Sequence, residues 1–347
     1  MGTAVEVARK AGISRSSAYE ILANPKHPCY PQATRQRVLA AAKEVGYVPH
    51  AAGRALRTRQ AHTIGVLADK GSLTVGHAGG VFTDFLPGLC VGAAKFDYYV
   101  LVEVDHPAEP ERNLKFHREL ACSGRIDGIV IASPAVNDPR LDIFRSADIP
   151  IVVRGGSFLE KDFDTVGNDR TEVLRLATQH LLDLGHRRIV HLTGPTFPVG
   201  FEERKRGYRE AMEAAGAEPR NVIVYDEAFV PVRQVEEVVE DMWSSAQPPT
   251  AVVADDDILA VDVVHTLQRR GLNVPSDVSV VGVNDSNMCL RIQPTLTSVS
   301  LNTWRTGEEA ARLLISRIKN PGQPVRRVTV PCELIVRDSS QQVRQPV

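Results

Sequence analysis

The chain has 347 residues and a formal net charge of −1, with 43% hydrophobic and 24% charged residues. This is the composition of an ordinary globular protein, and the length predicts two or three domains. No apolar run approaches the ~18 residues of a membrane span, and the N-terminus lacks the pattern of a secretion signal, so neither a membrane protein nor an exported one is expected. Five scattered cysteines without a CxxC pair predict reduced thiols, a cytoplasmic location and no metal site.

The charge is divided unevenly along the chain. Residues 1–60 contain ten Lys and Arg against three acidic residues, a balance of +7, whereas the remainder has a balance of −8. A basic segment on an acidic body is typical of proteins that bind a polyanion. A solvated basic surface would give the same balance, so charge alone leaves both interpretations open.

Three short helices are expected in the basic segment. Thr3 can cap the first, with Glu6 at capping-box spacing, and Gly12 ends it. Ser14 can cap the second, and the third runs from about Thr34 to Val45. The residues expected to face inward are Val7, Ala8, Ala11, Ala18, Ile21, Leu22, Val38, Leu39, Ala42 and Val45.

The first two helices and their short turn have the spacing of a helix-turn-helix. In that motif, residues at the start of the second helix meet base edges in the major groove of DNA. Here these residues are Arg15 and Ser16, with Glu20 one turn later. A small helical bundle without a DNA function is the alternative.

From Thr63 onward, β-rich runs alternate with helical segments. The strand candidates are residues 63–69, 98–104, 128–133, 149–153, 188–194, 221–226, 250–255 and 278–285. Near-continuous apolar strands with helices between them indicate buried parallel sheets. Because these strands are too many for one compact sheet domain of this kind, we expect two doubly wound subdomains with a cleft between them.

Polar residues follow several of these strands. In doubly wound sheets, ligands bind beyond the carboxyl ends of the strands. That rule selects Asp69, Asp169, Asp255, Asp256, Asp257 and Asn284 as candidate ligand contacts. An Asp at a strand end also often caps the next helix, so each of these residues has a purely structural alternative.

Two stretches carry a family resemblance, "TAVEVARKAGISRSSAYEIL" (3–22) and "TRQRVLAAAKEVGYVPHAAGRALRT" (34–58). With the body that follows, the chain resembles the LacI/GalR family of bacterial transcription regulators over nearly its whole length. The resemblance implies a dimeric repressor that binds a pseudo-palindromic operator and responds to a small molecule, a sugar or sugar derivative. It also implies a periplasmic-binding-protein-like body.

The resemblance, taken with the strand pattern, sets the expected domain boundaries. The helix-turn-helix head covers 1–48, a hinge helix covers 49–61, and the ligand-binding and dimerisation domain covers 62–347. Within that domain, the N-subdomain is expected at 62–163 and 291–323, and the C-subdomain at 164–290 and 324–339.

Within this hinge and linker, a helix over residues 50 to 58 is too short to be stable alone in water, and Gly53 weakens it further. We expect it to become helical on the operator, with two copies from the dimer together in the minor groove. Leu56 would then wedge between base pairs and bend the DNA, a role that the resemblance also implies. Arg54 and Arg57 would hold phosphates or the groove.

The head departs from the family pattern at several positions. Glu20 stands where an Arg is usual, so it either accepts a hydrogen bond from cytosine N4 or turns toward Arg15. His50 stands where Asn is usual, and Pro31 replaces the usual Ser before the third helix. Phosphate contacts, which position the protein without reading sequence, are expected from Thr3, Ser14, Ser17, Tyr47 and His50.

The resemblance adds two effector contacts to the ligand cleft and supports two that the strand-end rule already selects. Arg204 lies in an Arg-x-x-Gly-Tyr motif that places the arginine in the cleft, Phe229 matches a stacking aromatic, and Asp256–Asp257 match an Asn-Asp pair. Asn284, Arg170 and Gly155 stand where Asp, Asn and an acid are common, which makes the cleft less acidic than a typical sugar pocket. An anionic effector, such as a sugar phosphate or sugar acid, becomes more plausible.

Two other classes of protein are alternatives to a regulator. A solute-binding protein for uptake shares the body but requires export. An enzyme is not expected, because no GxxxxGK[ST], HExxH or GxSxG motif occurs, and no cofactor is expected. The polar tail "SSQQVRQPV" lacks a heptad pattern for a tetramer bundle, so we expect a homodimer.

Overall fold

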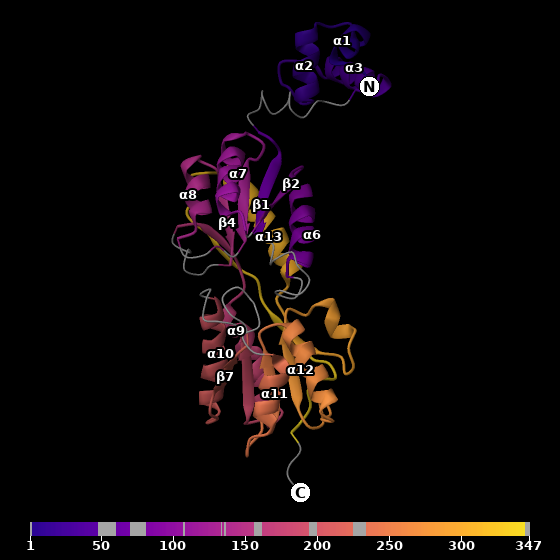
Figure 1. Cartoon of the computed structure of the whole chain (residues 1–347). Coiled ribbons are helices and arrows are strands. Elements are labelled where there is room, and N and C mark those ends of the chain that lie inside the picture. Colours follow the sequence, from indigo (N-terminus) through magenta and orange to yellow (C-terminus); the bar gives the residue numbers. More distant parts are fainter. Residues whose placement is uncertain are drawn as a thin grey trace. The chain divides into compact units, whose positions relative to one another are not determined.

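The computed structural model in Figure 1 describes residues 2–47, 60–69, 81–106, 108–132, 134, 137–155, 162–193, 200–224 and 234–343. These residues belong to two compact units, Met1–Thr63 with Ser123–Asp127 and Ile64–Cys122 with Gly128–Val347. In the part of the chain that the structure describes, no helix is long and apolar enough to cross a membrane.

The first unit contains the three predicted helices, α1 (Ala4–Ala11), α2 (Arg15–Ala23) and α3 (Gln32–Glu44). The capping box of Thr3 and Glu6 is present, and Gly12 ends α1 in the left-handed conformation with φ of 64°. The helices pack on one another through Val7, Ala11, Ile21, Val38, Ala41 and Ala42.

One predicted core residue of this unit is wrong. Leu39 is 38% exposed, while Val38, Ala41 and Ala42 are buried. Positions 38, 41, 42 and 45 share one helical face, and residue 39 lies about 100° away from position 38. The apolar character of Leu39 therefore misled the assignment.

The second unit contains two six-stranded sheets. The N-terminal sheet has the strand order β11-β5-β4-β3-β1-β2. Its strands are β1 (Thr63–Asp69), β2 (Tyr99–Asp105), β3 (Gly128–Ala132), β4 (Ile151–Arg154), β5 (Asp164–Gly167) and β11 (Arg327–Thr329). The helices drawn around it in Figure 1 are α6 (Val81–Ala94), α7 (Pro110–Cys122), α8 (Pro139–Ser146) and α13 (Thr303–Lys319).

The C-terminal sheet has the order β12-β10-β9-β8-β6-β7. Its strands are β6 (Ile189–Thr193), β7 (Arg220–Ile223), β8 (Ala251–Ala254), β9 (Ser279–Val283), β10 (Thr297–Ser300) and β12 (Glu333–Ile335). Among the described pairs of this sheet, only the pairing of β12 with β10 is antiparallel. Its helices are α9 (Arg170–Asp183), α10 (Gly200–Ala214), α11 (Val235–Trp243), α12 (Asp257–Arg269) and the short η2 (Asn287–Leu290). Separate apolar cores form on its two faces.

The chain passes between the two sheets three times, after β5, after β10 and after β11. The sequence places these passages earlier, near residues 162–166, 288–293 and 322–327, because β5, β10, β11 and β12 were not anticipated. The amide of Asn168 donates to the carbonyls of Leu301 (2.9 Å) and Val330 (2.8 Å). One side chain thus ties all three crossing segments together.

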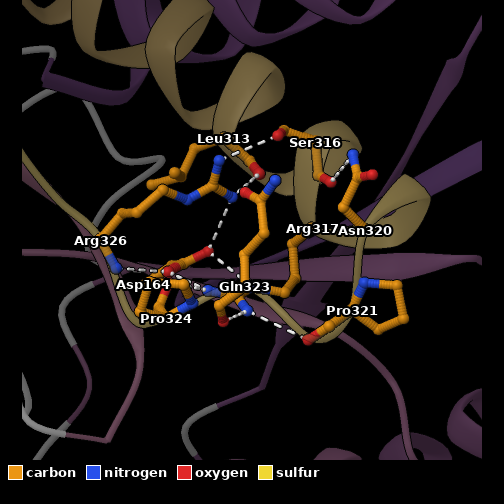
Figure 2. Close-up of polar contacts among 9 residues, drawn as sticks. All are labelled: Asp164, Leu313, Ser316, Arg317, Asn320, Pro321, Gln323, Pro324 and Arg326. Carbon is orange, nitrogen blue, oxygen red and sulfur yellow. Dashed lines mark hydrogen bonds and ion pairs between the residues drawn. The ribbon is translucent and has the colours of Figure 1, made fainter.

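A buried carboxylate secures the edge of the N-terminal sheet (Figure 2). Asp164 begins β5 and is 2% exposed. Both of its oxygens bind Arg317 of α13, at 2.7 and 2.9 Å, and it also accepts from the backbone of Arg326, which precedes edge strand β11. The cluster therefore joins β5, α13 and the start of β11.

Candidate functional site

The start of α2 presents the predicted DNA-reading residues to solvent. Arg15 and Ser16 are exposed, and Ser14, also exposed, caps the helix by accepting from the backbone of Ser17 at 3.0 Å. Because the cap fixes the first turn of α2, the side chains that would enter a groove project from a defined backbone. Thr3 is exposed at the start of α1, and Tyr47 is half-buried.

Glu20 has a partner that the sequence analysis did not consider. The hydroxyl of Tyr30 donates to Oε2 of Glu20 at 2.5 Å, and this bond raises the pKa of Tyr30. Arg15 instead lies over the ring of Tyr19, 5.6 Å from its centroid. The expectation that Glu20 turns toward Arg15 is therefore wrong.

Several predicted site residues lie outside the described residues. These are His50, Arg54, Leu56 and Phe229, and with them the expected hinge helix. Asp69 ends β1, at the carboxyl end of that strand, but its side chain is not among those described.

In the C-terminal sheet, polar side chains gather where β6 and β8 end. Asp255 follows β8 and is 4% exposed. Its carboxylate meets Nε2 of His191 at 3.1 Å and accepts a short hydrogen bond from Thr193. Burial by itself would raise the pKa of Asp255, but His191, the charge of Arg204 and the hydrogen bond from Thr193 outweigh burial and lower it.

The two acidic residues that follow Asp255 have structural partners. Asp256 caps α12 by accepting from the backbone of Leu259 at 2.8 Å. Asp257 is fully buried, and it accepts from the hydroxyl of Ser298 (2.6 Å) and the backbone of Ser286 (2.7 Å). Burial, together with the charges of its two acidic neighbours, raises the pKa of Asp256 to about 6. Both residues thus stabilise the backbone at the carboxyl ends of the strands.

Asp169 and Asn284 occupy the strand-end positions that the sequence predicts. Asp169 is exposed and caps α9 by accepting from the backbone of Thr171 at 3.0 Å and of Glu172 at 3.2 Å. Asn284 follows β9 with φ of 107°, and its backbone donates to the carbonyl of Val299. The structural alternative, helix capping, therefore describes the contacts of Asp169 as well as those of Asp256.

The Arg-x-x-Gly-Tyr motif lies on α10 and directs Arg204 toward this edge. Tyr208 is fully buried and its hydroxyl donates to the carbonyl of Ile189 at 2.8 Å, which fastens α10 to the sheet. A side chain at Gly207 would place Cβ 1.9 Å from the carbonyl oxygen of Thr171, so only glycine lets α10 approach α9 this closely. Nη1 of Arg204 then donates to the carbonyl of Asp255 at 2.9 Å.

The geometry thus joins Arg204, Asp255, Asp256 and Asp257 at one sheet edge, together with His191 and Thr193. Sequence reasoning missed the last two, although a histidine inside the apolar strand "IVHLT" was a signal. Such an edge can bind hydroxyls and anionic groups through its donors and acceptors. Within the described ranges, no group of three His, Cys, Asp or Glu side chains is arranged to hold a metal ion.

Residues 178–340 match the family model described as a periplasmic binding protein-like domain. The HTH-type transcriptional regulator CelR of Thermobifida fusca is 32% identical over 343 residues, which cover 96% of this chain and 96% of CelR. The HTH-type transcriptional repressor CytR of Escherichia coli (strain K12) is 28% identical over 343 residues, covering 97% of this chain and 96% of CytR. The similarity therefore includes both the head and the body.

Solved structures give the same result. A complex of the transcriptional regulator CelR with cellobiose has a TM-score of 0.70 and 28% identity, and it covers 98% of this chain and 100% of that chain. The lac repressor dimer bound to operator and the anti-inducer ONPF has a TM-score of 0.79 at 21% identity, with 98% and 99% covered, and it shows the fold.

Proposed function

The chain belongs to the LacI/GalR family of bacterial transcription regulators, and from that premise we propose which of its residues bind DNA and which bind the effector. It is a DNA-binding transcriptional repressor and not an enzyme. Its operator affinity is controlled by a small-molecule effector of the sugar type, and its partners are operator DNA, that effector and a second copy of itself. One observation carries this function: a helix-turn-helix head and a two-sheet body occur together along nearly the whole length of the relatives.

The DNA contacts in this proposal come from the head. Arg15, Ser16 and Glu20 of α2 contact base edges, and through such contacts a protein recognises a DNA sequence. Backbone phosphates are held by the remaining residues of the predicted set, Thr3, Ser14, Ser17, Tyr47 and His50. The exposure of Thr3 and of Ser14 to Ser16 supports this assignment.

The hinge in this proposal is residues 49–61, between a head at 1–48 and a body at 62–347. Leu56 wedges between base pairs in the minor groove, with Arg54 beside it on the phosphates. The protein acts in the cytoplasm, where its DNA target is.

The effector in this proposal binds at the carboxyl edge of the strands. Arg204 is the main contact, supported by its position beside Asp255. The other contacts are Asp69, Asp169, Phe229, Asp256, Asp257 and Asn284. Asp256 and Asp169 also cap helices, and Asp257 also binds Ser298 of β10. An effector that binds these residues therefore competes with hydrogen bonds that stabilise the C-terminal sheet and its helices.

A pull-down of fragmented genomic DNA with the full-length protein, followed by sequencing, tests the function. We expect enrichment of segments that share one pseudo-palindromic site, and loss of that enrichment in the Leu56→Ala variant. Recovery of random segments by both proteins would argue against a sequence-specific regulator.

A further inference from the structure

Two unusual residues of the chain meet in the body. Gly155 follows β4 of the N-terminal sheet, and Arg170 is the first residue of α9, which belongs to the C-terminal sheet. A Cβ at Gly155 would lie 2.5 Å from Nη2 of Arg170, and Gly155 has φ of 70°. The absence of a side chain at position 155 therefore leaves the space that the guanidinium of Arg170 occupies.

A second guanidinium lies near the first. Gly207 brings α10 against Thr171, the neighbour of Arg170, and Arg204 stands one turn before Gly207 on the same helix. The two cations act on each other: burial, and then the charge of Arg204, lower the pKa of Arg170 to about 10, against an opposing effect of Glu203. The charge of Arg204 thus makes the charged form of Arg170 less favourable.

Two of the nearby carboxylates are directed elsewhere. Asp169, adjacent to Arg170, accepts from backbone amides of α9. Asp255, beside Arg204, is bound by His191 and Thr193. The charge of Glu203 also acts on Arg170, but burial and the charge of Arg204 outweigh its effect on the pKa of Arg170.

We propose that the effector carries an anionic group, a carboxylate or a phosphate, which binds between Arg170 and Arg204 above Gly155. This rests on the proposed function and specifies its ligand. A planar guanidinium binds either group through two parallel hydrogen bonds. A neutral sugar would leave the mutual repulsion of the two cations in place, whereas an anion removes it. Because Gly155 and Arg170 belong to different sheets, the bound anion also bridges the two halves of the body.

The test uses the full-length chain, Arg170→Gln and, as a matched control on the same helix, Arg175→Gln, which removes an exposed arginine paired with Glu172. Thermal unfolding is followed in inorganic phosphate, in acetate and in chloride of equal ionic strength. A ligand that binds only the folded state raises the unfolding temperature as its concentration rises above Kd. Arg170→Lys, which keeps the charge without the fork, covers the case in which Arg170→Gln folds poorly.

We expect at least one of the two anions to stabilise the wild type and Arg175→Gln, with an apparent affinity at least about tenfold weaker in Arg170→Gln. Stabilisation by phosphate alone assigns a phosphate group, and stabilisation by acetate, with or without phosphate, assigns a carboxylate. Calorimetry with glucose 6-phosphate, glucuronate and cellobiose then compares whole ligands.

The proposal is overturned if neither anion stabilises the wild type, if Arg170→Gln responds as the wild type does, or if cellobiose binds more tightly than both anionic sugars. Binding of the same samples to genomic DNA without ligand separates two failures. If DNA binding persists, only the anionic ligand is wrong; if it is absent, the proposed function is wrong.

Discussion

Two buried aspartates show how similar chemistry serves different purposes in the two sheets. Asp164 is 2% exposed and Asp255 is 4% exposed, and both have a lowered pKa despite burial because cationic or hydrogen-bonding partners stabilise the charged form. Asp164 stands at the amino end of β5, and Asp255 follows the carboxyl end of β8. In doubly wound sheets, ligands bind at the carboxyl ends.

The partners of the two carboxylates differ accordingly. Two arginines bind Asp164, because Nη2 of Arg326 lies 3.2 Å from Oδ2 in addition to the contacts of Arg317. Arg317 donates its other N–H groups to the carbonyls of Pro321, Gln323 and Pro324, so protein groups surround the cluster (Figure 2). The arginine beside Asp255 touches the backbone at 2.9 Å and the carboxylate only at 4.0 Å. Both the position on the sheet and the partners of the carboxylate thus distinguish the structural cluster at Asp164 from the proposed ligand site at Asp255.

The largest effect in this comparison is expected from removal of the structural carboxylate, Asp164. Asp164→Ala leaves two arginines without their buried partner, and we expect unfolding free energy to fall by about 3–5 kcal/mol. Urea denaturation measures this, with the exposed neighbour Asp162→Ala as the control. Ligand binding by the folded variant should be unchanged; a loss of ligand binding that exceeds the unfolded fraction would contradict the division into two roles.

The ligand side of the comparison is tested by Arg204→Ala. Its guanidinium donates to the backbone carbonyl of Asp255 at 2.9 Å, and loss of a hydrogen bond of this kind is expected to lower stability by about 1 kcal/mol. Affinity for whichever sugar probe binds the wild type should fall about a hundredfold, as for loss of a charged hydrogen-bond pair. Calorimetry checks this, with Arg209→Ala on the same helix as the control. Unchanged affinity would remove Arg204 from the site.

A third carboxylate, Asp256, differs from Asp164 and Asp255 because its pKa is raised in the folded protein. The pKa of Asp256 rises from 3.8 to about 6 in the folded protein. The folded state therefore binds more protons than the unfolded state between these values, and stability is lost as pH rises from about 4 to about 6. We expect Asp256→Asn, which keeps a capping oxygen, to be more stable than the wild type by about 1–3 kcal/mol at pH 7 and equally stable near pH 4. Urea denaturation of both proteins at the two pH values measures this difference. Equal stability of Asp256→Asn and the wild type at pH 7 would show that the charged carboxylate does not destabilise the folded state.

The smallest effect is expected in the head, where Glu20 is half-buried and bound to Tyr30. Glu20→Ala and Tyr30→Phe remove the same hydrogen bond, so both should lower the stability of the head slightly and to a similar extent. If Glu20 also reads a base, only Glu20→Ala should relax selection at one operator position, by about 1–3 kcal/mol. Selection from random DNA compares the variants, and an unchanged preferred site in Glu20→Ala would limit Glu20 to the bond with Tyr30.

Apolar runs and caps predict much of this fold, and the exceptions have physical causes. All eight strands with long apolar runs are present within one or two residues at most ends. The strands β10 ("TSVS"), β11 ("RVT") and β12 ("ELI") have only three or four residues and no long apolar run, so periodicity does not reveal them. They flank the crossings between the sheets, which explains why those crossings were placed too early.

The sequence predicts several individual residues of the candidate site, but it does not predict which of them lie together in space. Strand-end rules and the Arg-x-x-Gly-Tyr motif indicate Asp256, Asp257 and Arg204. Nothing in the local pattern indicates that Arg170 fills the space over Gly155, because the two residues belong to different sheets and meet only through the fold.

The central claim is that the chain binds a specific DNA sequence, and the most direct test is the salt dependence of that binding. Affinity of the full-length protein for the recovered operator and for an unrelated duplex of equal length is measured across a series of salt concentrations. We predict that both affinities fall steeply and linearly on logarithmic axes, and that the operator is bound about a thousandfold or more tightly than the unrelated duplex. Equal affinity for the two duplexes, or binding that does not depend on salt, would contradict the claim.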